Sequence, residues 1–275
     1  MIVFFVLPCY NNLQEIFMAL LADYHTHTKY SRNGHGKSTV EENVRVAYEK
    51  GLRQIAITDH GFNQKTFGIR RKDMPQLKAD VEDAKERYPI DVLIGVEANL
   101  LDSQGNIDIV DSDYDNLDIL LCGFHKLVKS TSTREQCKFI LKNIMCGIFH
   151  HTSKRQREKN TNAYINAMRK YDIDIITHLN HDCKVDVEKV ARVAKETNTL
   201  IELNGKRLGM NDKEILKCYE LGCKFVINSD AHHCKRVGEC HRGLQAVLRL
   251  RLPESCIVNY NDLPKLKKEK RKKRS

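Results

Sequence analysis

Two pairs of residues in the sequence have the spacing of metal ligands. His25 and His27 stand two residues apart, and so do Asp230 and His232. Side chains two apart on a β-strand lie on the same face, so each pair can point at one ion. Imidazoles with a few carboxylates suit Zn, Mn or Fe better than Mg or Ca. We therefore take both pairs as candidate metal ligands.

Other ligand-type residues bring the candidate set to nine. The nine are His25, His27, His35, His60, Glu97, His125, His178, Asp230 and His232. His35 lies in a Gly-His-Gly loop, whose flexible backbone could bring the imidazole back over the site. One divalent ion takes about four to six ligands, so the set predicts two or three ions that share a carboxylate, with Zn favoured and Mn or Fe as alternatives. A histidine that only caps a strand explains each position singly, but not all nine together.

Short apolar runs precede most of these residues and predict the strands that position them. The runs are 20–27, 54–60, 91–99, 117–125, 172–178, 199–204 and 224–232. Near-continuous Ile, Val and Leu is typical of strands buried on both faces of a parallel sheet. Helical spacing predicts helices at 38–51, 72–88, 185–197, 211–222 and 238–250, and two more between 126 and 171. Ser38 and Glu41 are predicted to form the capping box of the first helix.

This alternation of strands and helices predicts one α/β domain. Strands joined by helices indicate right-handed βα units and a parallel sheet. The candidate ligands follow six of the seven strands, at the carboxyl ends where a (β/α) barrel gathers its active site. An open doubly wound sheet would carry a glycine-rich phosphate loop after its first strand, and the sequence has none there. We therefore predict a TIM-like barrel of seven strands.

At these motifs the sequence resembles the PHP family, named for polymerase and histidinol phosphatase domains. The resemblance covers about residues 21–260, through Asp23-Tyr24-His25-Thr26-His27, Thr58-Asp59-His60-Gly61, Gly95-Val96-Glu97, Gly123-Phe124-His125, Thr177-His178 and Asn228-Ser229-Asp230-Ala231-His232. It implies a distorted seven-stranded barrel with a trinuclear metal site. It also implies how the ligands divide: His25, His27, Glu97 and Asp230 on one ion, Glu97 bridging to a second held by His125 and His178, and His35, His60 and His232 on the third.

The sequence departs from the family pattern in two loops and at its N-terminus. Leu179-Asn180 stands where the family usually has Pro-Gly. Residues 204–210 (NGKRLGM) differ from the usual loop after the sixth strand, which could alter the substrate. Family members generally begin near Met18. We expect an N-terminal extension over 1–17, a barrel domain over 18–260 and a basic, disordered tail over 261–275.

Three dications held by two carboxylates favour an anionic substrate, above all a phosphate ester. We predict that a small phosphomonoester is hydrolysed by a metal-bridging hydroxide, with Glu97 and Asp230 as the catalytic carboxylates. Arg70 and Arg71 are candidate substrate contacts at the rim, although they could equally form a solvated charge cluster. The general acid stays open among three residues: Asp59, His181 and His233.

Several other functions compete with this prediction. Histidinol phosphatase shares the fold and the metals, and no residue here reports on that substrate. An amidohydrolase-type enzyme would usually bring a bridging lysine and an aspartate from an eighth strand. A phosphodiesterase or exonuclease acting on nucleic acid is not favoured, because the body lacks a basic stripe with interleaved aromatics and the chain has no tryptophan. A non-catalytic metal-binding module would lack some ligands, and all nine are present.

Most of the positive charge belongs to the C-terminal tail. Residues 265–275 hold eight basic groups and one acidic, or +7 of the formal +10, which leaves +3 for the rest of the chain. The ten cysteines include no C-x-x-C pair and predict reduced thiols in a cytoplasmic protein. The apolar N-terminal run breaks at Pro8, short of the ~20 residues of a membrane span, so we expect no membrane association.

Overall fold

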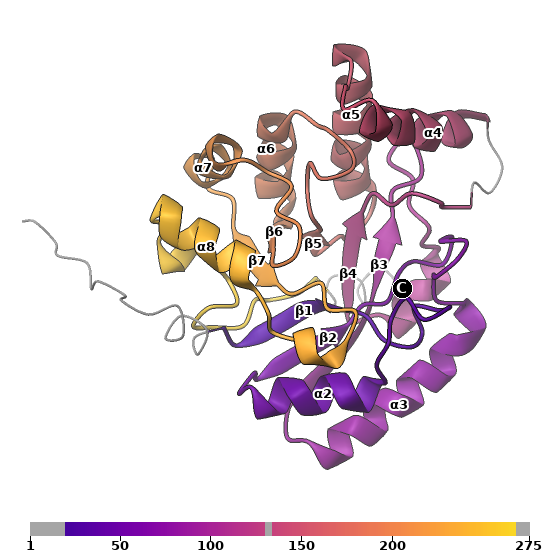
Figure 1. The fold of residues 1–275 in the computed structure, drawn as a ribbon, viewed down its shortest axis with the longest axis vertical. Coiled ribbons are helices and arrows are strands. Elements are labelled where there is room, and N and C mark those ends of the chain that lie inside the picture. The colour runs from indigo at the N-terminus through magenta and orange to yellow at the C-terminus, as the bar shows by residue number, and fades with distance from the viewer. Residues whose placement is uncertain (1–19, 130–133, 268–275) are drawn as a thin grey trace, which may run out of the picture.

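The fold is built on seven parallel strands that follow one another around a barrel in sequence order (Figure 1). The structure is a computed structural model that describes residues 20–129 and 134–267. The strands are β1 (Ala22–Thr26), β2 (Gln54–Ile57), β3 (Asp91–Asn99), β4 (Ile119–Gly123), β5 (Ile175–Ile176), β6 (Leu200–Asn204) and β7 (Phe225–Asn228). Each neighbouring pair is parallel. The prediction of a single seven-stranded barrel domain is confirmed.

Helices surround the strands, as the sequence predicts. They are α2 (Val40–Glu49), α3 (Met74–Arg87), α4 (Arg134–Ile148), α5 (Lys154–Lys170), α6 (Val187–Thr197), α7 (Asp212–Glu220) and α8 (His241–Leu250). None of these described helices is long and apolar enough to cross a membrane.

The capping box of α2 lies one residue later than predicted. Thr39 and Glu42 form it, each side chain accepting a hydrogen bond from the other residue's backbone N–H. Ser38, the predicted cap, is buried, and its Oγ accepts a hydrogen bond from the Cys234 N–H (2.7 Å). The prediction of a Ser38–Glu41 box is therefore wrong, because a contact with the loop after β7 takes the Ser38 hydroxyl.

Apolar side chains fill one end of the barrel interior. They are Ala22, Tyr24, Ala56, Ile119, Leu121, Ile175 and Val226. Along each strand these residues precede the candidate ligands, so the apolar packing occupies the amino-terminal end. A larger apolar cluster joins the outside of the barrel to the helices. The carboxyl end is thereby left to polar groups, as is usual for active sites of such barrels.

Asn259 helps to close the barrel between β1 and β7. This buried side chain donates through Nδ2 to the carbonyls of Ala22 (2.8 Å) and Ile227 (2.7 Å). Its Oδ1 accepts from the Ile227 N–H (3.1 Å). An isolated backbone bridge joins Thr26 to Ala231 further along the same gap. The hydrogen bonds of one amide side chain thus replace part of the backbone pairing between β1 and β7.

The C-terminal segment packs at the amino end of the barrel. Leu263 and Leu266 contact the inner apolar cluster. Lys267 is buried, and its Nζ donates to the carbonyl of Ile173 and to Thr199 Oγ1 (2.9 Å). Residues 261–267, assigned to the tail from sequence, therefore lie against the barrel. The predicted extension over 1–17 and the end of the basic tail, 268–275, lie outside the described residues.

We expect Asn259→Ala to lower the free energy of unfolding by about 3 kcal/mol, because it leaves buried carbonyl and N–H groups without partners. Urea or thermal unfolding would measure this. The control is Asn261→Ala, which removes an exposed hydrogen bond to Glu254 and should cost under ~0.5 kcal/mol. Equal losses in the two variants would contradict the role of Asn259 in closure.

Candidate metal centre

Glu97 on β3 lies at the centre of the site, fully buried among imidazoles that come from other strands. Its Oε2 lies 3.0 Å from His60 Nδ1, 3.2 Å from His125 Nε2 and 3.3 Å from His25 Nε2. Its Oε1 lies 2.9 Å from His178 Nε2. One carboxylate therefore meets ligand-type side chains from β1 and from the ends of β2, β4 and β5.

Asp230, just after β7, is a second carboxylate that several imidazoles surround. Its Oδ1 lies 3.3 Å from His232 Nδ1, 3.5 Å from His27 Nε2 and 3.9 Å from His25 Nε2. The backbone φ is +55° at Asp230 and +31° at His178. Residues other than glycine seldom adopt positive φ, and such strain is concentrated at functional sites. The fold thus holds two candidate ligands in place at a conformational cost.

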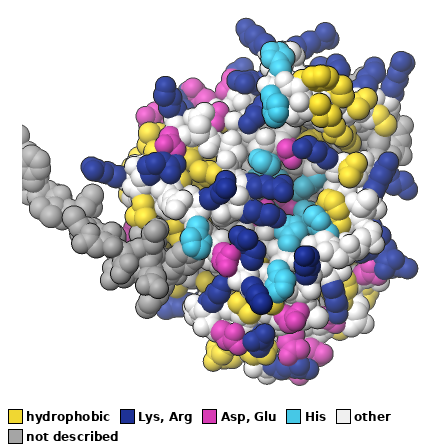
Figure 2. Space-filling model, in the orientation of Figure 1, with side chains coloured by type: hydrophobic (Ala, Val, Ile, Leu, Met, Phe, Trp, Pro, Cys, Tyr) yellow, Lys and Arg dark blue, Asp and Glu magenta, His cyan; other side chains and the backbone are white. Residues whose placement is uncertain are grey.

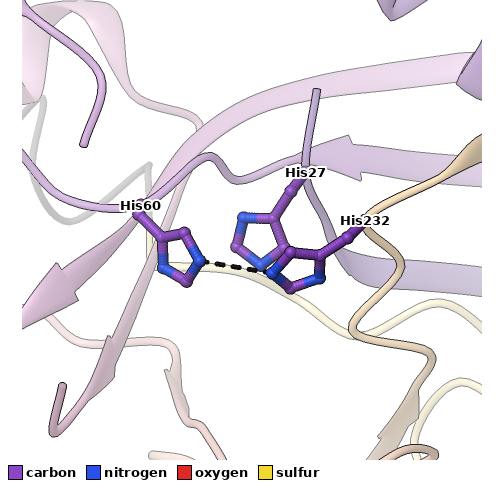
Figure 3. Close-up of side chains that lie close together, drawn as sticks. All are labelled: His27, His60 and His232. Atoms are coloured by element: carbon purple, nitrogen blue, oxygen red, sulfur yellow. Dashed lines mark hydrogen bonds between the residues drawn. The ribbon is translucent and has the colours of Figure 1, made fainter. Parts of the chain in front are cut away.

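Three histidines from distant parts of the chain converge beside this pair of carboxylates (Figure 3). The rings of His27 and His60 stack with their centroids 4.1 Å apart. His232 Nε2 lies 3.4 Å from His60 Nε2 and 3.0 Å from His35 Nε2. All nine predicted positions thus lie in one connected cluster, and their role as metal ligands stays a prediction.

Several buried atoms at the centre have no hydrogen-bond partner within the described residues. They are Nε2 of His25, His27 and His125, Nδ1 of His60, and Oε2 of Glu97. Buried polar atoms are nearly always paired, so a concentration of unpaired lone pairs indicates groups built to bind a cation. Three overlapping groups have ligand atoms close enough for one ion: His27, His60 and His232; His25, His27 and Glu97; His60, Glu97 and His125. The residues present therefore fit divalent metal ions.

The protonation states of three candidate histidines also suit metal binding, although neighbouring carboxylates raise the pKa of His25 and His178 against the effect of burial. Burial lowers the pKa of His27 well below its usual value, that of His60 to about 3 and that of His232 to about 4. These imidazoles are then neutral at pH 7, with a lone pair free for a ligand bond. Burial alone would raise the pKa of Glu97, but the imidazoles of His125 and His25 hold it well below its usual range. Neutral nitrogens and an ionised carboxylate are what a divalent ion requires.

A second buried carboxylate, Glu202 on β6, holds the candidate ligands in position. Its Oε1 lies 2.8 Å from His25 Nδ1, and its Oε2 accepts from the His178 N–H (2.8 Å). The amides of Asn204 and Asn228 also donate to it. Such contacts orient a ligand imidazole and fix its tautomer. Sequence analysis did not single out Glu202, although an acidic residue inside the apolar run 199–204 is a usable signal.

Asn99 and Asp59 give similar support. Asn99 Oδ1 lies 2.9 Å from His125 Nδ1. Asp59, a candidate general acid, accepts hydrogen bonds from the backbone N–H and the hydroxyl of both Thr28 and Ser31. Ser31 Oγ in turn lies 3.4 Å from His27 Nδ1. Asp59 is therefore engaged in fixing the loop after β1.

The other two candidates for the general acid differ in position. His233 Nδ1 accepts a hydrogen bond from the Lys235 N–H, so it caps a short helical turn. His181 lies beside the site, with its ring centroid 6.2 Å from that of His178. His181 is therefore the candidate best placed to exchange a proton with a bound substrate.

Lys206 brings a positive charge to the site that the sequence prediction missed. Its Nζ lies 3.3 Å from His232 Nδ1 and 3.9 Å from Asp230 Oδ1. The predicted rim contacts point elsewhere: Arg70 pairs with Asp73, and Arg71 pairs with Asp113. Their contact with substrate stays a prediction.

The two loops that depart from the family pattern pack against each other. Asn180 has φ +68°, and its Oδ1 accepts from the Val185 N–H (3.0 Å), which shapes the loop after β5. A Cβ on Gly209 would lie 2.3 Å from the Leu179 carbonyl oxygen, so only glycine fits there. The loops after β5 and β6 that depart from the family pattern therefore pack together, and Lys206 lies in the second of them.

Comparison with solved structures agrees with this barrel. The histidinol phosphate phosphatase of Lactococcus lactis, complexed with Zn, L-histidinol and phosphate, superimposes with a TM-score of 0.54 at 14% identity, over 84% of this chain and 92% of that one. A putative histidinol phosphatase of Listeria monocytogenes gives 0.52 at 16% identity, over 79% and 97%. At these identities the likeness concerns the fold.

Sequence comparison defines the family. The family model for the PHP domain matches residues 23–213, so the chain belongs to the PHP domain family. It is 32% identical over 274 residues to a probable phosphatase of Thermoanaerobacter sp. (strain X514), covering 93% of this chain and 98% of that protein. It is 30% identical to a probable phosphatase of Acetivibrio thermocellus, over 92% and 98%. The resemblance inferred from the motifs is confirmed.

We expect Glu202→Gln to weaken zinc binding by about tenfold to a hundredfold, because removing a partner that orients ligand histidines has effects of this size. Competition with a chromophoric chelator would measure the affinity. Glu196→Gln is the matched control, since Glu196 forms an exposed 3.5 Å pair with Arg169. Unchanged affinity in Glu202→Gln would show that Glu202 does not position the ligands.

Proposed function

We propose that the protein is a metal-dependent phosphatase that hydrolyses small phosphomonoesters. The observation that carries the proposal is the buried Glu97 carboxylate in contact with imidazoles from four other strands, with several of their lone pairs unpaired. Family membership and the probable phosphatases among its relatives support the same activity. Imidazole-rich ligand sets favour Zn, with Mn or Fe as alternatives.

The proposed ligand sets are those that the resemblance to the PHP family implies. The three sets are His25, His27, Glu97 and Asp230; Glu97, His125 and His178; and His35, His60 and His232. The short distances from Glu97 to His25 and His125 support its place in two sets. The approach of His232 Nε2 to both His35 and His60 supports the third. Divalent ions held there would supply Lewis acidity toward phosphoryl oxygens and toward water.

The chain's own side chains have distinct roles in this proposal. Glu97 and Asp230 hold the metals and set the negative charge of the site. Lys206 binds a phosphate oxygen of the substrate, because its ammonium group lies within 4 Å of the ligands His232 and Asp230. His181 is the candidate for protonating the leaving alkoxide. Glu202 keeps His25 and His178 in position and does not meet the substrate.

Histidinol phosphate is the second candidate substrate. The observation in its favour is the fold of the Lactococcus lactis enzyme, whose complex contains L-histidinol and phosphate. The test is elemental analysis of the purified protein together with a screen of phosphomonoesters, histidinol phosphate and a phosphodiester, each with and without chelator. Activity on the diester alone, or activity that persists without metal, would overturn the proposed function.

We expect Glu97→Gln to lower kcat by about a thousandfold or more, because the loss of the shared carboxylate disrupts two proposed ion sites. Steady-state kinetics and zinc content measured on the same preparation would test this. Glu82→Gln is the control, since Glu82 forms an exposed pair with Lys85. Wild-type turnover in Glu97→Gln would exclude the proposed centre.

We expect Lys206→Met to raise KM by about tenfold while kcat falls less, because a cation that contacts the substrate phosphate contributes mainly to binding. The parallel variant Arg71→Met tests the rim position predicted from sequence. A raised KM in Arg71→Met with an unchanged KM in Lys206→Met would assign phosphate binding to the rim instead.

A further inference from the structure

Helix α4 and the first part of α5 form a hairpin, residues 134–160, whose inner face is fixed by buried contacts. Asn143 and Asn160 exchange two side-chain hydrogen bonds (3.0 and 2.7 Å). Phe139 is buried and stacks edge-on against Phe124, at the end of β4. These contacts orient α4, so the residues on its opposite face point away from the barrel.

That opposite face carries an exposed apolar stripe. Leu141, Met145, Ile148 and Phe149 keep 59%, 41%, 62% and 67% of their side-chain surface exposed. Their spacing of four, seven and eight residues places them along one side of a helix. Figure 2 shows hydrophobic side chains gathered over α4, on the same face as a central group of histidines. Four large apolar side chains in one exposed stripe indicate a binding surface.

A cationic cavity lies between the two helices of the hairpin. It has a volume of about 330 Å³, and its lining includes Lys138, Lys142, Arg155 and Lys159, with no acidic side chain among the described residues that line it. Lys138 and Lys142 stand on the same helix as the apolar stripe, on the side that faces α5. The stripe is thus bordered by positive charge.

The net charge of the chain is also concentrated in this hairpin and in the C-terminal tail. Residues 134–160 hold seven Lys or Arg and two Glu, a net charge of +5. Residues 265–275 hold +7, so the remaining residues have 31 basic and 33 acidic groups, a net charge of −2. The hairpin is therefore the basic part of an otherwise slightly acidic barrel.

We propose that the hairpin docks on the surface of a membrane that contains anionic lipids. The apolar stripe enters the interface between headgroups and acyl chains, and the cationic cavity receives lipid phosphate. An exposed apolar face bordered by lysine and arginine is the pattern of interfacial helices that bind anionic bilayers. This goes beyond the proposed function and revises our expectation of no membrane association, which considered only segments able to span a bilayer.

Other occupants fit the hairpin less well. A second copy of this chain would bring +5 against +5, and like charges across an interface oppose association. A nucleic acid would match the charge, but it would leave Leu141, Met145 and Ile148 without an apolar partner. A bilayer with anionic headgroups satisfies both the charge and the apolar stripe.

The test is flotation of the full-length protein with vesicles of phosphatidylcholine alone or mixed with phosphatidylserine. Wild-type protein should float with the mixed vesicles and not with phosphatidylcholine alone, and high salt should weaken binding. Ile148→Ser combined with Phe149→Ser should reduce the partition coefficient by about tenfold or more. Lys142→Glu combined with Arg155→Glu should remove the preference for phosphatidylserine. Each variant keeps the basic tail, so a difference from wild type reports on the hairpin.

Matched controls come from α7 and α8, which α6 separates from the hairpin. Leu216→Ser with Tyr219→Ser alters exposed apolar residues of α7, and Lys213→Glu with Arg242→Glu alters exposed charges. Both should float like wild type. Equal flotation of wild type and the Ile148/Phe149 variant would overturn the proposal. A concentration-dependent dimer of the wild type that this variant abolishes would also overturn it, because a second copy would then cover the stripe. So would a lower Tm of this variant, because another part of the same chain would then cover the stripe.

Discussion

The structure depends on keeping one carboxylate, Glu97, ionised inside a barrel that excludes water. An ion in that position costs several kcal/mol of lost hydration unless other groups compensate. Here the compensation comes from imidazoles at 2.9–3.3 Å rather than from lysine or arginine. Because these imidazoles belong to different strands, the strands must end at the same level around Glu97. The contacts of Glu97 therefore require a particular register of the strands in the barrel.

The barrel meets this requirement by giving its two ends different chemistry. Apolar side chains such as Tyr24 and Leu121 pack the amino end, and they supply the burial that stabilises the domain. The carboxyl end is filled by ligand-type groups and by the carboxylates that orient them, chiefly Glu202 and Asp59. Since hydrogen bonds through Asn259 close the remaining gap, the strands cannot separate without disturbing both ends.

The barrel fold and the clustering of the candidate ligands could be predicted from the sequence because they depend on local patterns. Contacts between residues far apart in the chain could not. The clustering of the candidate ligands was predicted because period-two spacing and strand ends are local features, as in His25 and His27. Glu202 and Lys206 were missed because their significance comes from contacts between β6, its loop and residues far along the chain. The capping box was displaced by one residue because Ser38 bonds to Cys234, a contact that no local pattern records. The pairing of Arg71 with Asp113 could not be predicted, because the two residues lie 42 positions apart in the chain.

The burial of Lys267 determines where the basic tail leaves the domain. Lys267 is bonded to Ile173, Asp174 and Thr199, which stand just before β5 and β6, at the amino ends of the strands. At Lys267 the chain is therefore held at the pole opposite the candidate metal centre. The buried charge of Lys267 and the candidate metal centre are therefore spatially uncoupled.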